Sequence, residues 1–214
     1  MAFASDRDCV AMEPGVMSDA AWTGQRLLSS TGGVSGTTLT LDAGGVDLEA
    51  AGIGAGHVVL VAGVALEVVS RDSATTATVS RVRESLEASA IPPGDSAGVK
   101  VEVYSFASVL GTVHRQVLRM AGIDPDDPSV GALGESDVVN GGSLRELEAA
   151  GALHLVYSAA SAAGPIGGEM ERRARAWRDR FWAERQRARV LVDLDGDGEA
   201  DAARRLNSVR FVRG

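Results

Sequence analysis

The period of the hydrophobic pattern changes along this chain, and that change constrains the fold more than any single motif. From Gly32 to about Phe106, apolar and polar residues alternate, and Gly, Thr and Val are frequent. Such alternation is typical of half-buried β-strands. Outside this stretch, apolar residues recur every three to four positions, as they do on one face of a helix. The sequence therefore predicts a β-domain inserted into a helical part.

Five short strands are expected in the β-domain. They are SGTTLTL (35–41), HVVLVAG (57–63), ALEVVSR (65–71), TATVSRV (76–82) and VKVEVYSF (99–106). Gly63 lies between the second and the third, where a tight hairpin needs a residue that tolerates positive φ. Short strands at nearly regular spacing predict a small antiparallel barrel or sandwich.

Helices are expected on both sides of the β-domain. Ser18 is a suitable N-cap for a helix through AAWTGQRLL. Gly122 ends the helix ASVLGTVHRQVLRMAGI. Ser143 and Glu146 form a capping box at the start of the next helix, which Gly151 interrupts. A long charged helix, EMERRARAWRDRFWAERQRAR, follows.

These elements predict an α+β fold: a helical bundle with an inserted small antiparallel β-domain and a C-terminal β-hairpin. The bundle comprises residues 1–31 and 107–189, and the β-domain comprises residues 32–106. Residues 190–214 form the hairpin, because RVLVDL and NSVRFVR flank an acidic loop. If this hairpin is a docking arm, deleting residues 190–214 leaves a folded bundle that no longer docks.

Charge is distributed unevenly. Residues 1–168 contain 9 Lys or Arg and 20 Asp or Glu, a balance of −11, whereas residues 169–214 contain 12 Arg and 9 acids, a balance of +3; together they give −8. The acidic body argues against a general nucleic-acid-binding protein, which needs a broad basic face. An acidic body with an Arg-rich end suits head-to-tail docking between like subunits or docking onto a partner.

The apolar runs are too short to cross a bilayer. Charged residues interrupt the first twenty positions, so no secretory signal is expected. The protein is therefore expected to be cytosolic or to be assembled in a cytosol. The single cysteine, Cys9, excludes an internal disulfide. It is expected to be a small packed residue in the first helix.

The residue patterns of common enzymes are missing from the sequence. His57, His114 and His154 lie in different predicted elements without metal-site spacing, so a structural role is expected for each. Neither a Gly-x-Ser-x-Gly nucleophile motif nor a Gly-x-x-x-x-Gly-Lys phosphate loop occurs. The sequence therefore predicts a protein that is not an enzyme.

The stretch VLVDLDGDGEAD (190–201) has the spacing of a calcium loop. Asp193, Asp195 and Asp197 alternate, a glycine takes the sixth place, and Asp201 takes the ninth. This spacing can direct successive oxygen atoms onto one hard cation. The twelfth place is Arg204 instead of the bidentate Glu of the helix–loop–helix hand, so that form is not expected.

Two interpretations of the acidic loop stay open. In the first, the loop holds Ca²⁺ through Asp193, Asp195, Asp197, the Glu199 carbonyl and Asp201. In the second, it is a polar Asp-Gly turn that reverses the chain, with Arg204 and Arg205 neutralising the acids. Either way the loop would hold a hairpin together instead of performing a reaction, and no other cofactor is expected.

The long charged helix also allows two interpretations. Its arginines can form a solvated face, partly paired to Glu171, Asp179 and Glu184. Alternatively, its aromatic and arginine side chains form a subunit interface, since Trp and Arg dominate such contacts. The candidate interface residues are Trp177, Arg178, Phe181, Trp182 and Arg185, together with Arg210, Phe211 and Arg213 near the carboxyl end. Trp182 lies off the main apolar stripe, so it is the residue expected to face a neighbour.

With this layout, the chain resembles head-to-tail adaptor (connector) proteins of tailed bacteriophages. The stretches that carry the resemblance are MEPGVMSDAAWTGQRLL, VHRQVLRMAGI, SLRELEAAGALHLVYSAA and MERRARAWRDRFWAERQRARVLVDLDGDG. A long charged helix that runs into an acidic hairpin is common at the carboxyl end of such proteins. The inserted β-domain departs from the smallest members, which are nearly all helical, and looks like small barrels of phage neck and tail parts.

The resemblance implies a structural virion protein: one subunit of a dodecameric ring that joins the portal to the tail and continues the DNA channel. Its partners would be copies of itself, the portal protein, a downstream neck or tail-terminator protein, and DNA that passes without sequence-specific binding. It would lie in the virion neck, after synthesis and assembly in the host cytoplasm, without contact to a membrane. In the family, portal docking often lies in the carboxyl-terminal segment, here residues 190–214.

The rival interpretation is a calcium-dependent adhesion or binding module that uses the DLDGDGEAD loop and the β-domain. Such a module would leave the predicted helices without a role.

Overall fold

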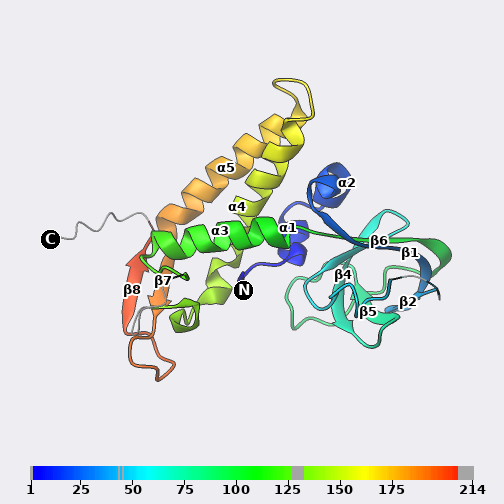
Figure 1. Cartoon of the computed structure of the whole chain (residues 1–214), viewed down its shortest axis with the longest axis horizontal. Helices are drawn as coiled ribbons and strands as arrows, with labels where there is room; N and C mark the ends of the chain where they lie inside the picture. The colour runs from blue at the N-terminus through cyan, green and yellow to red at the C-terminus, as the bar shows by residue number, and fades with distance from the viewer. Residues whose placement is uncertain (1, 43, 45, 127–132, 207–214) are drawn as a thin grey trace. The chain divides into compact units, whose positions relative to one another are not determined.

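The computed structural model describes residues 2–42, 44, 46–126 and 133–206, and the chain divides into two compact units (Figure 1). We call Ser5–Ser108 the barrel unit. The helical unit consists of Met1–Ala4 and Val109–Gly214. The α+β class expected from the sequence is confirmed.

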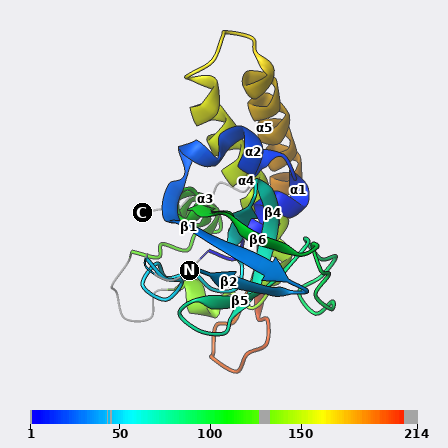
Figure 2. The same cartoon turned by 90° about the vertical axis from the view of Figure 1, so that its right-hand side faces the viewer.

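The barrel unit contains a closed antiparallel barrel with the strand order β1-β2-β5-β4-β3-β6 (Figure 2). Its strands are β1 (Gln25–Ser35), β2 (Thr38–Leu41), β3 (Val58–Val61), β4 (Val64–Arg71), β5 (Thr76–Ser80) and β6 (Ser96–Ser105). The five expected strands correspond to β2 to β6, and the closed barrel decides between the two expected architectures. Closure pairs the last strand with the first, which protects the backbone groups of a sheet edge.

The β3–β4 hairpin confirms the role expected for glycine at its turn. Val61 pairs with Val64, and the two residues between them, Ala62 and Gly63, have φ values of 50° and 82°. Positive φ at both central residues is the geometry of a two-residue turn whose twist matches that of the strands.

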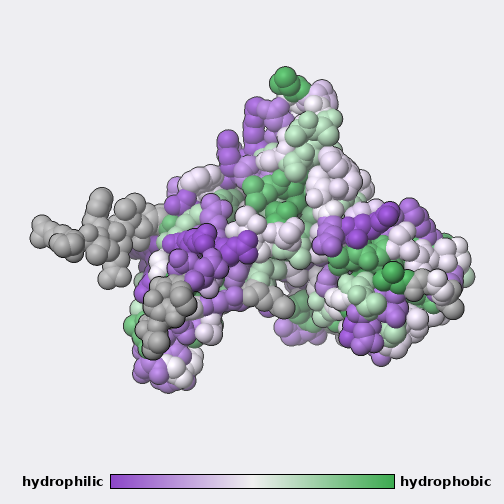
Figure 3. Space-filling model, in the orientation of Figure 1, coloured by the Kyte–Doolittle hydropathy of each residue, from purple (hydrophilic) through white to green (hydrophobic). Residues whose placement is uncertain are grey.

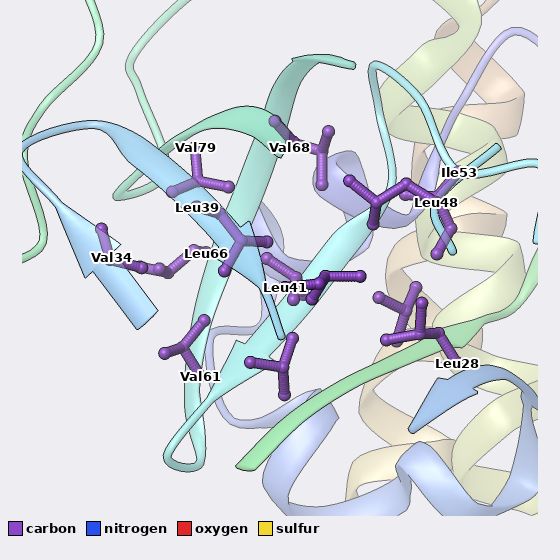
Figure 4. Close-up of a cluster of buried hydrophobic side chains, with 14 residues drawn as sticks. Leu28, Val34, Leu39, Leu41, Leu48, Ile53, Val61, Leu66, Val68 and Val79 are labelled. Atoms are coloured by element: carbon purple, nitrogen blue, oxygen red, sulfur yellow. The ribbon is translucent and has the colours of Figure 1, made fainter. Parts of the chain in front are cut away.

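Aliphatic side chains from alternate strand positions fill the barrel (Figure 4). In β2, Leu39 and Leu41 are buried while Thr38 and Thr40 are exposed. The buried cluster consists of Leu28, Val34, Leu39, Leu41, Leu48, Ile53, Val59, Val61, Leu66, Val68, Ala77, Val79, Val101 and Val103. The barrel therefore closes around a packed core, as the period-2 pattern predicts.

The helix expected from Ser18 through AAWTGQRLL does not form beyond Thr23, and Ser18 is not its N-cap but lies inside a helix capped by Gly15. α2 (Val16–Ala20) and the 3₁₀ turn η1 (Ala21–Thr23) stop at Gly24, and the chain continues as β1. A Cβ at Gly24 would lie 2.7 Å from the carbonyl oxygen of Ser105, so the strands approach too closely here for a side chain. β1 pairs with β2 on one side and β6 on the other, and this pairing outweighs local helix propensity. Most of the segment 1–31 therefore belongs to the barrel unit.

Buried ion pairs hold α1 (Asp6–Met12) within the barrel unit. Glu67 of β4 is 1% exposed; Arg7 donates to its carboxylate from Nε at 2.9 Å, and Arg83 donates to it as well. Arg7 also donates to the carbonyl oxygen of Arg83. Cys9 lies in α1 without exposed surface, which confirms the expected packed residue, and its burial raises the pKa of the thiol well above the usual value.

The helical unit consists mainly of an antiparallel helix hairpin crossed by a third helix. The hairpin is formed by α4 (Gly141–Ser161) and α5 (Glu169–Arg187), and α3 (Ala107–Met120) crosses it (Figure 1). The expected bundle of helices is not confirmed. Gly122, with φ of 72°, follows α3 as expected.

Gly151 lies where the three helices meet, and α4 continues through it without a break. A Cβ at this position would lie 2.7 Å from Cγ1 of Val113 in α3 and 3.1 Å from the ring of Phe181 in α5. Glycine is therefore retained inside the helix because it allows the close approach, although it weakens the helix itself.

The capping box expected at Ser143 is wrong, because α4 begins earlier. Asn140 is the N-cap residue. Its side chain accepts a hydrogen bond from the Leu191 amide and donates to the carbonyl oxygen of Arg189. These tertiary contacts fix the start of the helix at Asn140. A capping pattern in the local sequence cannot reveal such contacts.

A C-terminal hairpin is confirmed, but its second strand is AARR and not the expected NSVRFVR, which lies outside the described residues, and the hairpin is not a free arm. It consists of β7 (Arg189–Val192) and β8 (Ala202–Arg205). Val190 and Val192 have no exposed surface, and Val138 pairs with Val192 on the other edge of β7. The hairpin belongs to the core of the helical unit, so a folded remainder after deletion of residues 190–214 is no longer expected.

We predict that Gly151→Ala destabilises the protein by about 1–3 kcal/mol, because the added methyl group overpacks the crossing of three helices. Gly142→Ala is the matched control, since it lies in the same helix with nothing within 4 Å of an added Cβ. Urea denaturation followed by circular dichroism measures both changes. Equal stability of the two variants would contradict the close packing at Gly151.

We also predict that Glu67→Gln costs about 3–5 kcal/mol, because it leaves Arg7 and Arg83 without the buried carboxylate that pairs with both. The control is Glu49→Gln. Its side chain is 69% exposed and lies 3.9 Å from Arg71, and such surface pairs contribute about 0–1 kcal/mol. Thermal unfolding of both variants tests the difference, and a loss at Glu67 no larger than at Glu49 would refute it.

Candidate functional site

The acidic loop between β7 and β8 brings three carboxylates together. Carboxylate oxygens of Asp193, Asp195 and Asp197 all lie within 4.8 Å of one another. Ca²⁺ takes oxygen ligands at about 2.3–2.6 Å, so one cation could contact all three carboxylates. The alternation expected from the sequence therefore does place these side chains on one side of the loop.

Asp193 organises the loop through the backbone. Its Oδ1 accepts a hydrogen bond from the Gly196 amide at 2.7 Å, and its Oδ2 accepts one from the Gly198 amide at 2.7 Å. These bonds, with the one from Gly198 contributing most, lower the pKa of Asp193 below the usual value of 3.8. Both glycines have positive φ, at 83° and 88°. The loop geometry is thus supported by its own amides.

Asp201 and Arg204 take different places from those expected. Asp201 accepts a hydrogen bond from the Leu194 amide at 2.7 Å and so closes the loop instead of joining the three-carboxylate cluster. Arg204 donates to the carbonyl oxygens of Ala121 and Gly122, each at 3.0 Å. A guanidinium at the carboxyl end of α3 satisfies free carbonyls and complements the helix dipole. Arg204 therefore does not act as the expected neutraliser of the acidic loop.

A second candidate surface is the outward face of α5. Trp177 and Phe181 are 8% and 7% exposed and pack into the helical unit, whereas Trp182 is 49% exposed. The Arg185 guanidinium lies 4.5 Å from the centre of the Trp182 ring and donates to the carbonyl oxygen of Leu206. Arg185 therefore holds the exposed indole in place, which lowers the entropy cost of using it in a contact.

The other arginines of α5 form a charged surface, and hydrophilic residues gather over this helix (Figure 3). Glu171 pairs with Arg175, and Asp179 pairs with Arg178, as expected. A further pairing, of Glu169 with the arginines one turn later, was not expected. Glu184 forms none of the ion pairs described for this helix. The candidate interface residues Arg210, Phe211 and Arg213 lie outside the described residues.

The expected structural role of the histidines agrees with their surroundings. His57 contacts the backbone of Gly54 within 3.2 Å, and His154 Nδ1 lies 3.0 Å from the carbonyl oxygen of Ala174. His114 differs, because it is buried and its Nδ1 lies 2.7 Å from a carboxylate oxygen of Glu148.

Sequence reasoning missed Glu148. A signal was present, because Glu148 follows Leu144 by four positions and therefore lies on the apolar face of α4. A charged residue on such a face indicates a buried partner.

In the described part of the chain, none of the helices is both long and apolar enough to span a membrane. No protein-family model, curated protein sequence or solved structure matches the chain.

We predict that Asp193→Asn loosens the hairpin turn, whereas Asp195→Asn does not. Asparagine keeps one acceptor oxygen, while Asp193 uses two; Asp195 accepts only a 3.3 Å contact from the Asp197 amide. Hydrogen exchange of the Gly196 and Gly198 amides, followed by NMR, should accelerate in the first variant alone.

The pH dependence of this turn follows from the lowered pKa of Asp193. Its stabilisation is present above the usual value of 3.8 and is lost as the pH falls through the lower folded value. Protection of these amides should therefore persist below pH 3.8, and its loss well above that pH would contradict the hydrogen-bonded geometry.

Proposed function

We propose that this chain is a structural subunit of a closed homo-oligomeric ring that acts as a head–tail adaptor of a tailed bacteriophage. The observation that carries the proposal is the exposed Trp182–Arg185 pair on α5. The inner side chains of this helix, Trp177 and Phe181, are already used in its own core. A held, half-exposed Trp beside Arg is the side-chain combination that most often anchors a subunit contact.

Charge complementarity supports contact between copies. The barrel unit contains 6 Lys or Arg and 13 Asp or Glu, a balance of −7, whereas α5 contains 7 Arg and 4 acids, a balance of +3. A heterologous interface between a basic surface of one copy and an acidic surface of the next forms a ring if the rotation closes.

In this proposal the ring is dodecameric and lies in the virion neck. It binds the portal protein on one side and a downstream neck or tail-terminator protein on the other, after assembly in the host cytoplasm. The net charge of −8 suits a channel through which DNA slides, because a basic wall would bind the phosphates. The chain contributes no enzymatic step and uses no membrane.

A second candidate function, a calcium-dependent binding module, is favoured by one observation. The three clustered carboxylates of the acidic loop carry like charges that a divalent cation would neutralise. Here the cation would stiffen the hairpin for binding a partner.

We predict that Trp182→Ala weakens ring assembly at least about tenfold in protein concentration, as loss of a contact anchor does. Trp22→Ala is the matched control, because Trp22 is 59% exposed and lies in the barrel unit. Native mass spectrometry and negative-stain electron microscopy measure particle mass and shape, with and without purified portal rings.

The same measurement with a calcium chelator separates the two candidate functions. Rings or portal complexes that survive the chelator and disappear in Trp182→Ala support the adaptor. A monomer that ignores portals and changes only with Ca²⁺ would replace the adaptor by the calcium-dependent module.

A further inference from the structure

A buried carboxylate in the middle of α4 binds the backbone of the N-terminal segment. Glu148 has no exposed surface, and its Oε2 accepts hydrogen bonds from the amides of Phe3 at 2.8 Å and Ala4 at 3.0 Å. Its Oε1 lies 2.7 Å from Nδ1 of His114 in α3. A carboxylate in an apolar interior is tolerated only when donors of this kind surround it.

His114 lies between two carboxylates. It is 4% exposed, and its Nε2 lies 3.2 Å from Oε2 of Glu135 in η2 (Glu135–Asp137), without the alignment of a hydrogen bond. A neutral imidazole carries only one N–H, whereas both ring nitrogens here face carboxylate oxygens. The arrangement therefore suits the imidazolium form, in which both nitrogens carry a proton.

The pKa of His114 agrees with this geometry. Burial alone would lower it, but the hydrogen bond and charge of Glu148, followed by the nearby charge of Glu135, raise it above the usual value of 6.5.

The ring of Phe3 packs into the same place. It meets the His114 ring edge-on, with centroids 4.8 Å apart and an interplanar angle of 80°. A Cβ at Gly141, the first residue of α4, would lie 2.5 Å from Cδ1 of Phe3, so the glycine makes room for the ring. We call Gly141, His114 and Glu148 the N-terminal seat.

We propose that the N-terminal seat is a reversible tie, which binds residues 3–4 while His114 is protonated and releases them when His114 loses its proton. Among the described residues, the charged groups that face His114 are Glu148 from α4 and Glu135 from η2, and the N-terminal segment contributes the Phe3 ring. When the imidazolium becomes neutral, the buried charge of Glu148 loses its cationic partner.

Release of residues 3–4 would change how the two units are connected by the chain. Ser5, directly after the seated residues, begins the barrel unit, and the chain returns to the helical unit at Val109. The seat therefore decides whether the barrel unit is joined to the helical unit through both of its chain ends or through one. This device is independent of the proposed ring.

The direction of the pH dependence follows from the raised pKa of His114. The tie has its full strength below 6.5, the usual value, and is lost as the pH rises through the higher folded value.

The test is hydrogen exchange of the Phe3 and Ala4 amides, measured by NMR as protection factors across the titration of His114. Protection should fall as the His114 resonances report deprotonation. Glu148→Gln should lower it about tenfold while His114 is protonated, as loss of a hydrogen bond to a charged acceptor does, and should change it little once His114 is neutral. The matched control is Glu146→Gln, in the same helix with a side chain that is 75% exposed, which should behave like the unmodified protein.

A second variant keeps the test decisive if Glu148→Gln fails to fold. Phe3→Ala alters only the segment, so the Ala4 amide should lose protection while the amides of residues 149–152 in α4 keep theirs. Loss of protection throughout α4 would make the segment a permanent part of the core and overturn the proposal. Protection that stays constant across the titration of His114 would overturn it as well.

Discussion

Two buried glutamates, one in each unit, require the rest of the structure to supply hydrogen-bond donors or cations to their carboxylates. Glu67 in β4 and Glu148 in α4 are 1% and 0% exposed, and an unpartnered carboxylate at either place would cost several kcal/mol. Arg7 donates to the first, and the amides of residues 3–4 donate to the second. A single short stretch at the start of the chain thus supplies hydrogen-bond donors to a buried carboxylate in each unit. Both glutamates lie far from this stretch in the sequence.

The helical unit depends on a second constraint, the close approach of its helices. α4 is buried on most sides, so α3, α5 and β7 must cover it together. Gly151 permits this approach, and Asn140 fixes where the helix starts relative to β7. Because the inner face of α5 is used for this cover, its outer face keeps the arginines and Trp182.

Sequence reasoning predicted the elements whose period is regular and whose partners are near in the chain. Strands β2 to β6, the turn at Gly63 and the buried stripe of α5 follow from local alternation and turn chemistry. β1 was missed, because its pairing with β6 joins residues far apart in the sequence. The start of α4 was missed for a related reason, since the Asn140 side chain binds β7. For the acidic loop, the alternation of acids predicted the three clustered carboxylates, whereas the contact of Arg204 with the end of α3 is tertiary.

Buried charged side chains have a structural role, whereas exposed charged side chains can contact partners. Glu67 and Glu148 are enclosed by donors, so their charges act only within their own units. The carboxylates of the acidic loop are held mainly by backbone amides of a turn that the two glycines with positive φ make possible. Amide hydrogen bonds to Asp193 stabilise the loop, and the carboxylates of Asp195 and Asp197 are exposed. On the same unit, α5 presents the opposite charge. In the proposed ring, opposite charges on separate elements of one unit would let the basic surface of one copy contact the acidic surface of the next.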